Sequence, residues 1–342
     1  MITSRGACAL FICGSAAVSC FSSAAAQSAA DFYRGNQIRL IIPSGPGGGY
    51  DVYARTFARH FGKHVPGNPS IISQNMPGAS GLLATNHVYL RGARDGTVLT
   101  NSYNTMTLEP LFGGMGVQYD PLKFNWIGSM GKQDSLCVTW HTSKTKTLQD
   151  AMKYETTVAS TGVTGNRATV PLIFNEAVGT QFKVIKGYDS AGSYLAVERG
   201  EVDGICGISH ATILASVPHW DSAQKINYIA QFSMKKNPRF PDVPLLLDAV
   251  KDAKFRDALG LILTMQEIGR PLVAPPGVPE DRLVALRNGF VATMKDPEFL
   301  FEARKMQLEL ELMEHDEIEK MLKSAFAAPK DVIDLATSLM GR

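Results

Sequence analysis

The sequence predicts an α/β protein of two domains, each a mainly parallel sheet flanked by helices, with a cleft between the domains. Three observations indicate this class. Short apolar runs rich in β-branched residues alternate with small-residue loops and segments of helical period. The alternation breaks at residues 120–142 and then resumes as a second block. The 342 residues also suffice for two domains of the usual ~100–200 residues each.

The composition is that of an ordinary globular protein, with 45% hydrophobic residues, 19% charged residues and a net charge of +2. The chain has no basic run, which argues against nucleic acid as a partner. Beyond the first thirty residues, no stretch approaches the ~20 apolar residues of a membrane span.

Residues 1–26 are predicted to be a secretory signal peptide. Arg5 supplies a positive charge, Ala7–Val18 is apolar, and Ala24–Ala26 offers a cleavage site. In a rival interpretation, Cys20 is the lipid-modified first residue of the mature protein.

The first structural unit is a strand, a glycine loop and a helix. Ile38–Ile42 is typical of a buried strand, and Pro43–Gly49 follows it with two prolines and four glycines. From Tyr50 the period is helical until the stop signals at Gly62 and Pro66. The sheet would hold the free N–H groups at the start of this helix rigidly, and such groups bind anions.

The spacing of the loop residues narrows the choice of anion. The dinucleotide fingerprint Gly-x-Gly-x-x-Gly fails, because Tyr50 stands at the third glycine position after Gly45 and Gly47. A P-loop needs Gly-Lys-Ser/Thr, whereas Gly49 is followed by Tyr50 and Asp51. The Asp51 carboxylate would also repel a di- or triphosphate. The loop therefore favours a small carboxylate, and the alternative is a tight turn without a ligand.

Two further strands repeat the pattern. One begins at Ile71–Ile72 and the next covers Thr97–Ser102, with a helix between them. Ligands bind parallel sheets at the carboxyl ends of the strands, so three loops should meet at one edge of this sheet. These loops are Ser44–Asp51, Asn75–Gly81 and Asn101–Thr105.

The segment 120–142 is predicted to cross into a second domain that copies the first. Its strands are expected at Phe124–Met130, Ser135–His141, Thr156–Ser160, Phe182–Ile185, Val202–Ile208 and Ile226–Phe232. Helices are expected at Thr147–Tyr154, after Arg167 and at Ser193–Arg199, with loops at Thr161–Arg167 and Lys186–Gly192. Leu259–Val273 would return the chain, and a strand at Leu308–Leu312 and a helix at Asp316–Leu339 would complete it. We therefore expect domain 1 at residues 27–133 and 262–342 and domain 2 at 134–261, with the two crossings as a hinge.

Removal of the leader leaves two of the five cysteines, Cys137 and Cys206. In an oxidising compartment two cysteines favour one disulfide, with two buried thiols as the alternative. The strand that carries Cys137, within the crossing segment, should enter the second sheet antiparallel and beside Val202–Ile208. The two cysteines would then lie on neighbouring strands, within reach of a disulfide.

No convincing catalytic or metal-binding group is evident, and we expect neither an enzyme nor a cofactor. His60 and His64 have a spacing that can hold zinc on a helix, but Gly62 between them indicates a helix end. Ser209 stands in a loose match to a nucleophile elbow that lacks the last glycine and the supporting Asp…His order. A secreted hydrolase using Ser209 is the alternative from this class.

Five motifs, in order along the chain, resemble a known family. They are Pro43–Asp51 with Ala54–Arg55, Asn75–Gly81, Glu198–Asp203, Pro241–Pro244 and Ala274–Pro279. Over roughly residues 36–335 the chain resembles the substrate-binding proteins of tripartite tricarboxylate transporters, also called the Bug family. The resemblance implies a periplasmic, type II-like two-domain receptor that holds a small organic acid for membrane permease subunits. We expect a monomer, and a ligand-sensing subunit for a membrane signalling partner is the alternative role.

The resemblance also implies where the ligand binds. Main-chain groups of the first two loops would hold one carboxylate, with bridging water, and the second-domain loops would bind its far end. The chain departs from the family pattern at Arg167 and Gly187–Ser190, so the resemblance does not specify the ligand. We expect Arg167 to pair with a distal carboxylate, and a solvent-facing arginine is the alternative. The expected ligand-binding residues are Ser44, Gly45, Gly47, Gly48, Gly49, Tyr50, Asp51, Asn75, Pro77, Gly78, Ala79, Ser80, Asn101, Tyr103, Ser160, Thr161, Gly165, Asn166, Arg167, Tyr188, Asp189 and Ser190.

Overall fold

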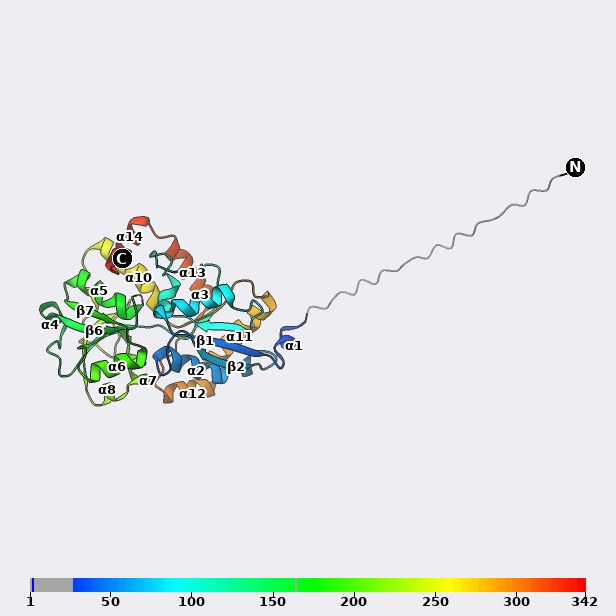
Figure 1. Ribbon diagram of the computed structural model, residues 1–342, viewed down its shortest axis with the longest axis horizontal. Helices are drawn as coiled ribbons and strands as arrows, with labels where there is room; N and C mark the ends of the chain where they lie inside the picture. The colour runs from blue at the N-terminus through cyan, green and yellow to red at the C-terminus, as the bar shows by residue number, and fades with distance from the viewer. Residues whose placement is uncertain (1, 3–26, 164) are drawn as a thin grey trace.

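The computed structural model describes residues 2, 27–163 and 165–342, so the predicted signal peptide lies outside the described residues apart from Ile2. The chain forms two lobes, each built on one sheet with helices on both sides (Figure 1). We call the lobe with the six-stranded sheet lobe 1 and the lobe with the five-stranded sheet lobe 2. The two-domain α/β fold is thereby confirmed. Within the described residues, no helix combines the length and the apolar composition needed to cross a membrane.

The sheet of lobe 1 has the strand order β11-β4-β10-β3-β1-β2. Its strands are β1 (Gln37–Ile42), β2 (Ser70–Asn75), β3 (Val98–Asn101), β4 (Asn125–Ser129), β10 (Pro271–Ala274) and β11 (Met313–Glu314). Strand β1 runs parallel to both β2 and β3, so the loops after these three strands meet at one edge of the sheet, as predicted. Strand β10 instead runs antiparallel to β3 and β4.

Helices pack against this sheet, against one another and, at the end of the chain, against the crossing helix that leads back from lobe 2. They are α1 (Ala29–Tyr33), α2 (Gly49–Phe61), α3 (Leu82–Arg91), α11 (Glu280–Lys295), α12 (Pro297–Lys305), α13 (His315–Phe326) and α14 (Lys330–Leu339), with short 3₁₀ turns η1 (Gly62–His64), η2 (Ala79–Gly81) and η3 (Asn104–Thr107). In α2 the stripe of Tyr53, Phe57 and Phe61 is at most 1% exposed. This burial, rather than intrinsic propensity, accounts for most of the stability of such a helix.

Two histidines at the end of α2 contact carboxylates of the α12 region. His60 Nε2 lies 2.6 Å from Glu302 Oε2, and His64 Nε2 lies 2.7 Å from Asp296 Oδ2. His60, Asp296 and Glu298 are close enough together to hold a metal ion. The ammonium group of Lys63, however, already bridges Asp296 and Glu298. The chain thus neutralises this cluster with its own side chain.

The sheet of lobe 2 has the order β7-β6-β8-β5-β9. Its strands are β5 (Ser135–Trp140), β6 (Thr156–Ser160), β7 (Phe182–Lys186), β8 (Gly204–Ser209) and β9 (Ile226–Phe232). Strand β6 is parallel to β7 and β8, whereas β5 is antiparallel to β8 and β9. Both sheets are therefore mixed rather than mainly parallel as predicted. The strand that follows each crossing, β5 or β10, runs against both of its neighbours.

The three predicted helices of lobe 2 and the return crossing are present, and three further short helices between residues 210 and 249 were not predicted. They are α4 (Leu148–Lys153), α5 (Asn166–Val178), α6 (Ser190–Glu198), α7 (His210–Ser216), α8 (His219–Ser222), α9 (Leu246–Ala249) and the crossing helix α10 (Ala253–Ile268). Helix α6 begins at Ser190 rather than at the predicted Ser193, because the Asp189 side chain caps it by accepting from the Gly192 N–H.

The strand predicted at Leu308–Leu312 is absent, and only Met313–Glu314 pairs with the sheet. The Tyr53 hydroxyl supplies the missing hydrogen bonds. It accepts from the Glu309 N–H at 2.9 Å and donates to the Glu309 carbonyl at 3.1 Å. A side chain thus satisfies the backbone here in place of a neighbouring strand.

The predicted disulfide between Cys137 and Cys206 is confirmed. Strand β5 lies antiparallel to β8 with Cys137 directly opposite Cys206, and the two are disulfide-bonded. Both residues are at most 1% exposed. The bond therefore fixes the first strand of lobe 2 to the centre of its sheet.

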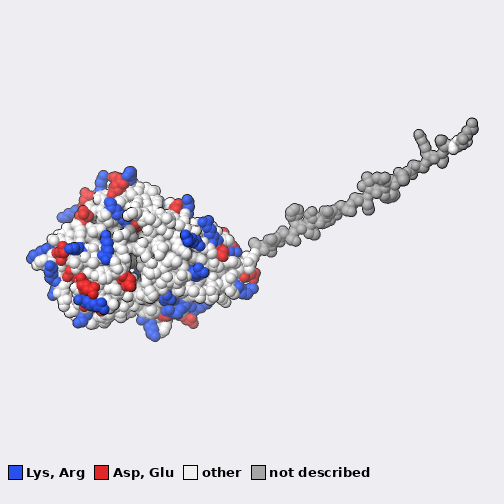
Figure 2. All heavy atoms as spheres, in the orientation of Figure 1, with Lys and Arg blue, Asp and Glu red and all other residues white. Residues whose placement is uncertain are grey.

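The charges on the surface are mixed in sign. On the face in Figure 2, lysines and arginines are interspersed with acids on both lobes, and the middle of the face is mostly uncharged. This face shows no large patch of one sign, as the absence of a basic run predicts.

Candidate functional site

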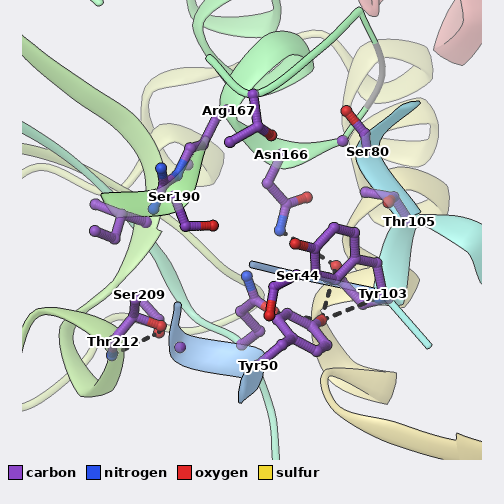
Figure 3. A pocket seen from close by; sticks show the side chains of 17 residues that line it. Ser44, Tyr50, Ser80, Tyr103, Thr105, Asn166, Arg167, Ser190, Ser209 and Thr212 are labelled. Atoms are coloured by element: carbon purple, nitrogen blue, oxygen red, sulfur yellow. Dashed lines mark hydrogen bonds between the residues drawn. The ribbon is translucent and has the colours of Figure 1, made fainter. Parts of the chain in front are cut away.

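Two neighbouring cavities lie between the lobes, an inner one of about 70 Å³ and an outer one of about 250 Å³. Residues from both lobes wall both cavities: Ser44, Ser80 and Tyr103 from lobe 1, and Thr161 and Ser190 from lobe 2 (Figure 3). Of the predicted residues, those at the walls are Ser44, Gly45, Gly49, Tyr50, Pro77, Gly78, Ala79, Ser80, Tyr103, Thr161, Gly165, Asn166, Arg167, Tyr188, Asp189 and Ser190. The walls do not include Gly47, Gly48, Asp51, Asn75, Asn101 or Ser160.

Asp51 does not face the cavity, and its side chain instead hydrogen-bonds to the loop that follows β1. Its carboxylate accepts from the Gly47 N–H at 3.0 Å, from Arg55 Nε at 2.8 Å and from Asn75 Nδ2 at 2.7 Å. Asn75 also donates to the Ser44 carbonyl at 2.9 Å. The charge of Asp51 is thereby satisfied within lobe 1, and the two residues hold the loop in shape.

Asn101 and Ser160 also make contacts with the backbone away from the cavity. Asn101 Nδ2 donates to the Pro271 carbonyl at 3.1 Å, and Ser160 Oγ donates to the Gly162 carbonyl at 3.0 Å. Each side chain fixes the end of a strand next to the cleft.

The start of helix α2 faces the inner cavity without a side-chain cap. Gly48 is the N-cap residue and offers no side chain to the first N–H groups of the helix. Gly49 lies against Thr212 of lobe 2, and a Cβ at position 49 would collide with the Thr212 side chain. The two lobes therefore touch at the amino end of α2, and only glycine permits this approach.

Three hydroxyl groups on the lobe 1 side of the inner cavity have no partner. Ser44 Oγ, Ser80 Oγ and Thr105 Oγ1 are buried and make no hydrogen bond to any described residue. Leaving a buried polar group unpaired costs about 1–3 kcal/mol. An occupant that hydrogen-bonds to these groups would recover that energy.

Tyr50, which is buried, and Tyr103, which is half-buried, pack edge to face beside these hydroxyls, with ring centroids 4.4 Å apart. Burial raises the pKa of Tyr103 to about 12, although the nearby charge of Arg167 lowers it, and burial also raises the pKa of Tyr50. Both phenols are therefore neutral hydrogen-bonding groups. The Tyr50 hydroxyl lies 2.7 Å from Gln133 Oε1 and 2.8 Å from the Gly269 carbonyl, so it ties α2 to both crossings.

Arg167 enters the inner cavity from the start of α5. Its Nη1 donates to Ser193 Oγ at 2.5 Å and its Nη2 to Tyr194 Oη at 3.1 Å, and the guanidinium lies over the Tyr194 ring. No described carboxylate is within ion-pair distance of Arg167. The side chain is thus positioned by neutral partners while its charge stays unpaired.

Comparison with known proteins identifies the fold and the family. Residues 54–337 match the family model described as the tripartite tricarboxylate transporter family receptor, which is most of the chain. The chain belongs to this family of receptors. A curated relative, the UPF0065 protein in the gbd 5′ region of Cupriavidus necator, is 25% identical over 319 residues, which are 90% of each chain.

Solved structures of similar fold agree with this assignment. The receptor is 17% identical to the periplasmic binding protein BugD, with a TM-score of 0.69 over 90% of this chain and 98% of that one. It is 19% identical to MatC from Rhodopseudomonas palustris with bound malate, with a TM-score of 0.68 over 87% and 99% of the two chains. At these identities the likeness supports the two-lobed fold.

Several wall residues of the receptor were not predicted from the sequence. Asn104 and Thr105 lie in the predicted loop Asn101–Thr105 but were not named as ligand-binding residues. Gln133 comes from the first crossing, and Ser209 and Thr212 come from the junction of β8 and α7. Asn166 Nδ2 donates across the cleft to Asn104 Oδ1 at 3.3 Å. Isolated polar residues in irregular segments carry no periodic signal, so only the folded topology reveals them.

Ser209 was considered as a hydrolase nucleophile, and it does lie at the inner cavity. Its oxygen accepts from Arg270 Nη2 at 3.0 Å and from the Thr212 N–H at 3.2 Å. These partners are hydrogen-bond donors, whereas a nucleophilic serine needs a base that accepts its proton.

Proposed function

We propose that this receptor captures a small organic carboxylate between its lobes and presents it, chemically unchanged, to membrane subunits of a tripartite transporter. The composition of the inner cavity carries the proposal. Among its lining residues Arg167 alone is charged, and most of the others offer hydroxyl, amide or main-chain groups. Such a wall suits a small anion that accepts many hydrogen bonds.

The start of α2 and the unpaired hydroxyls support this choice of ligand. Uncapped N–H groups and the helix dipole favour a negative charge, by up to ~2 kcal/mol in partly buried sites. Three or four charge-assisted hydrogen bonds at ~1.5–3 kcal/mol each would add roughly 5–12 kcal/mol. Ordering and association remove several kcal/mol, so we expect a dissociation constant near the micromolar range, about −8 kcal/mol.

The proposal also includes the compartment in which the receptor acts, the periplasm. Family membership and the sequence of residues 1–26 support export to the periplasm, and the disulfide suits an oxidising compartment. We propose that a monomer closes about the two crossings, with domain 1 at residues 27–133 and 262–342 and domain 2 at 134–261. No chemical step is part of this mechanism.

A thermal-shift screen tests the carboxylate hypothesis. The panel contains acetate, lactate, succinate, malate, citrate and benzoate, with glucose, glycine and ATP as controls. A ligand at 100 times its dissociation constant stabilises the folded state by ~2.7 kcal/mol, which gives a clear rise in the unfolding temperature. Stabilisation by at least one acid, confirmed by calorimetry, is expected. A response to ATP or glucose alone would contradict the proposal.

Arg167 is proposed to pair with a second, distal carboxylate of the ligand. Only two of its five N–H donors are used, so a bidentate contact remains available. Arg167→Ala should weaken binding of a dicarboxylate by about tenfold or more, and Arg167→Lys should weaken it less. A monocarboxylate held only at the start of α2 should bind both variants as it binds the parent. Equal losses for both ligand classes would contradict the distal role.

A further inference from the structure

Arg270 is a buried cation that forms no ion pair with a described residue, although its charge acts on Glu309, whose pKa is lowered by the hydrogen bond with His210 and further by Arg270. It follows the crossing helix α10, and its side chain is among the largest that are less than 2% exposed. Its Nη1 donates to the Lys132 carbonyl at 2.9 Å, and its guanidinium lies 4.0 Å from the centroid of the Tyr53 ring. Within the described residues, no carboxylate lies at ion-pair distance from it. A buried charge is costly unless it is paired, so this arginine calls for an explanation.

The other end of the guanidinium contacts two hydroxyls of lobe 2. Nη2 donates to Ser209 Oγ at 3.0 Å and lies 3.4 Å from Thr212 Oγ1. The Thr212 N–H also donates to Ser209 Oγ, at 3.2 Å. The two lone pairs of Ser209 are therefore both used, and its proton points to its remaining neighbour, Thr212 Oγ1, at 2.9 Å.

Counting the lone pairs and the proton of the Thr212 hydroxyl in the same way shows which of them is free for another group. Its hydroxyl oxygen accepts from Ser209 and, more weakly, from Arg270, which occupies both of its lone pairs. Only its proton is left for any other group. Ser209 and Thr212 both line the inner cavity, and Figure 3 shows them together, apart from Arg167. Thr212 also lies against Gly49, at the start of α2.

We propose that Arg270 is a positioning residue for the ligand: it orders the protons of Ser209 and Thr212 so that Thr212 donates to a carboxylate oxygen beside the start of α2. This rests on the proposed function of the cleft. The ligand's charge then adds to that of Glu309 as a counter-charge for Arg270, and it acts on Arg270 through the two hydroxyls. Thr212 belongs to lobe 2 and α2 to lobe 1, so one carboxylate bridges the lobes at this point.

Variants of Thr212 test the donor role. Each is titrated by calorimetry with acetate, lactate, succinate, malate, citrate and benzoate, and the comparison uses the acid that the parent binds most tightly. Thr212→Val keeps the shape and removes the hydroxyl, so affinity should fall about tenfold or more. Thr212→Ser restores the hydroxyl and should recover most of this loss. Thr337→Val is the control, because that hydroxyl contacts only the Ile333 carbonyl in α14.

Variants of Arg270 test whether it acts through Thr212. Arg270→Met should weaken the same acid by a similar factor, and adding Thr212→Val to Arg270→Met should cost less than threefold more, because the donor is no longer ordered. Arg270→Lys keeps the charge and should recover part of the affinity. The unfolding temperature without ligand is measured for each variant, and the Thr212 series stands if Arg270→Met does not fold.

The outcomes separate the two proposals. If the parent binds none of the six acids, the proposed function fails and this inference fails with it. If the parent binds an acid and Thr212→Val binds it equally well, the inference alone is wrong. A full additional loss from Thr212→Val in the Arg270→Met background would show that the two residues act independently, which also overturns it.

Discussion

Removing the disulfide between Cys137 and Cys206 should destabilise lobe 2 by about 4 kcal/mol. The two cysteines are 69 positions apart, so the bond closes a loop of about 70 residues in the unfolded chain. The loop-entropy relation gives roughly 3 kcal/mol for a loop of about 15 residues and about 4.7 kcal/mol for one of about 100 residues. The present loop falls between them. A loss of this size is a large part of the ~5–15 kcal/mol that stabilises a typical domain.

Urea unfolding with and without a reductant measures this loss. Two of the three tryptophans, Trp140 and Trp220, pack with ring centroids 5.6 Å apart in lobe 2, whereas Trp126 lies in β4 of lobe 1. Tryptophan fluorescence of a Trp126→Phe background therefore reports on the lobe that contains the bond. The double variant Cys137→Ala/Cys206→Ala is the control, because reductant should not shift its transition. The expected result is a lower urea midpoint for the reduced parent, corresponding to about 4 kcal/mol. A loss below about 1 kcal/mol would refute the loop-entropy reasoning for this lobe.

Two other predictions concern the hinge and the closure of the lobes. Burial, together with the charge of Glu267, raises the pKa of Asp134 to about 6, above its ordinary value of 3.8 in the unfolded chain. The contribution of Asp134 to the free energy of unfolding is therefore complete below pH ~4 and is lost as the pH rises through 6. Asp134→Asn should therefore be more stable than the parent at pH 7, by about 3 kcal/mol, and parallel urea-midpoint profiles between pH 4 and 7 would contradict this. Gly49→Ala places a methyl group against Thr212, where the two lobes meet, so calorimetry should show at least a tenfold loss of organic-acid affinity. Gly260→Ala, another helical glycine with open space around it, is the control, and an unchanged affinity of Gly49→Ala would argue against closure at this contact.

The parts of the fold that repeat a local pattern could be predicted from the sequence. Strand β1, the glycine loop and α2 form one such unit, because burial of the Tyr53, Phe57 and Phe61 stripe agrees with the local period. The Cys137–Cys206 pairing was also predictable, because one antiparallel strand after a crossing suffices to place it. The direction of β10 was not, since this antiparallel strand is only four residues long and buried throughout, so it has the continuous apolar pattern typical of parallel strands.

The candidate site was predictable only where it follows strands. The loops after β1, β2 and β6 supply most of the predicted wall residues, because strand ends of a parallel unit share one edge. Asp51 was misplaced, since its helix position does not reveal that its carboxylate faces Gly47 and Asn75. Gln133 and Thr212 were missed, because their approach to the cavity depends on how one lobe packs on the other.

The different make-up of the two sheets has a consequence for biogenesis. All strands of the smaller sheet lie between residues 135 and 232, so this sheet can assemble as soon as that stretch of the chain is free to fold. The larger sheet joins strands before residue 130 to strands after residue 270, and it must wait for the last part of the polypeptide. Folding would then be sequential. Lobe 2, with its disulfide, would fold first and provide a surface on which the sheet of lobe 1 is completed.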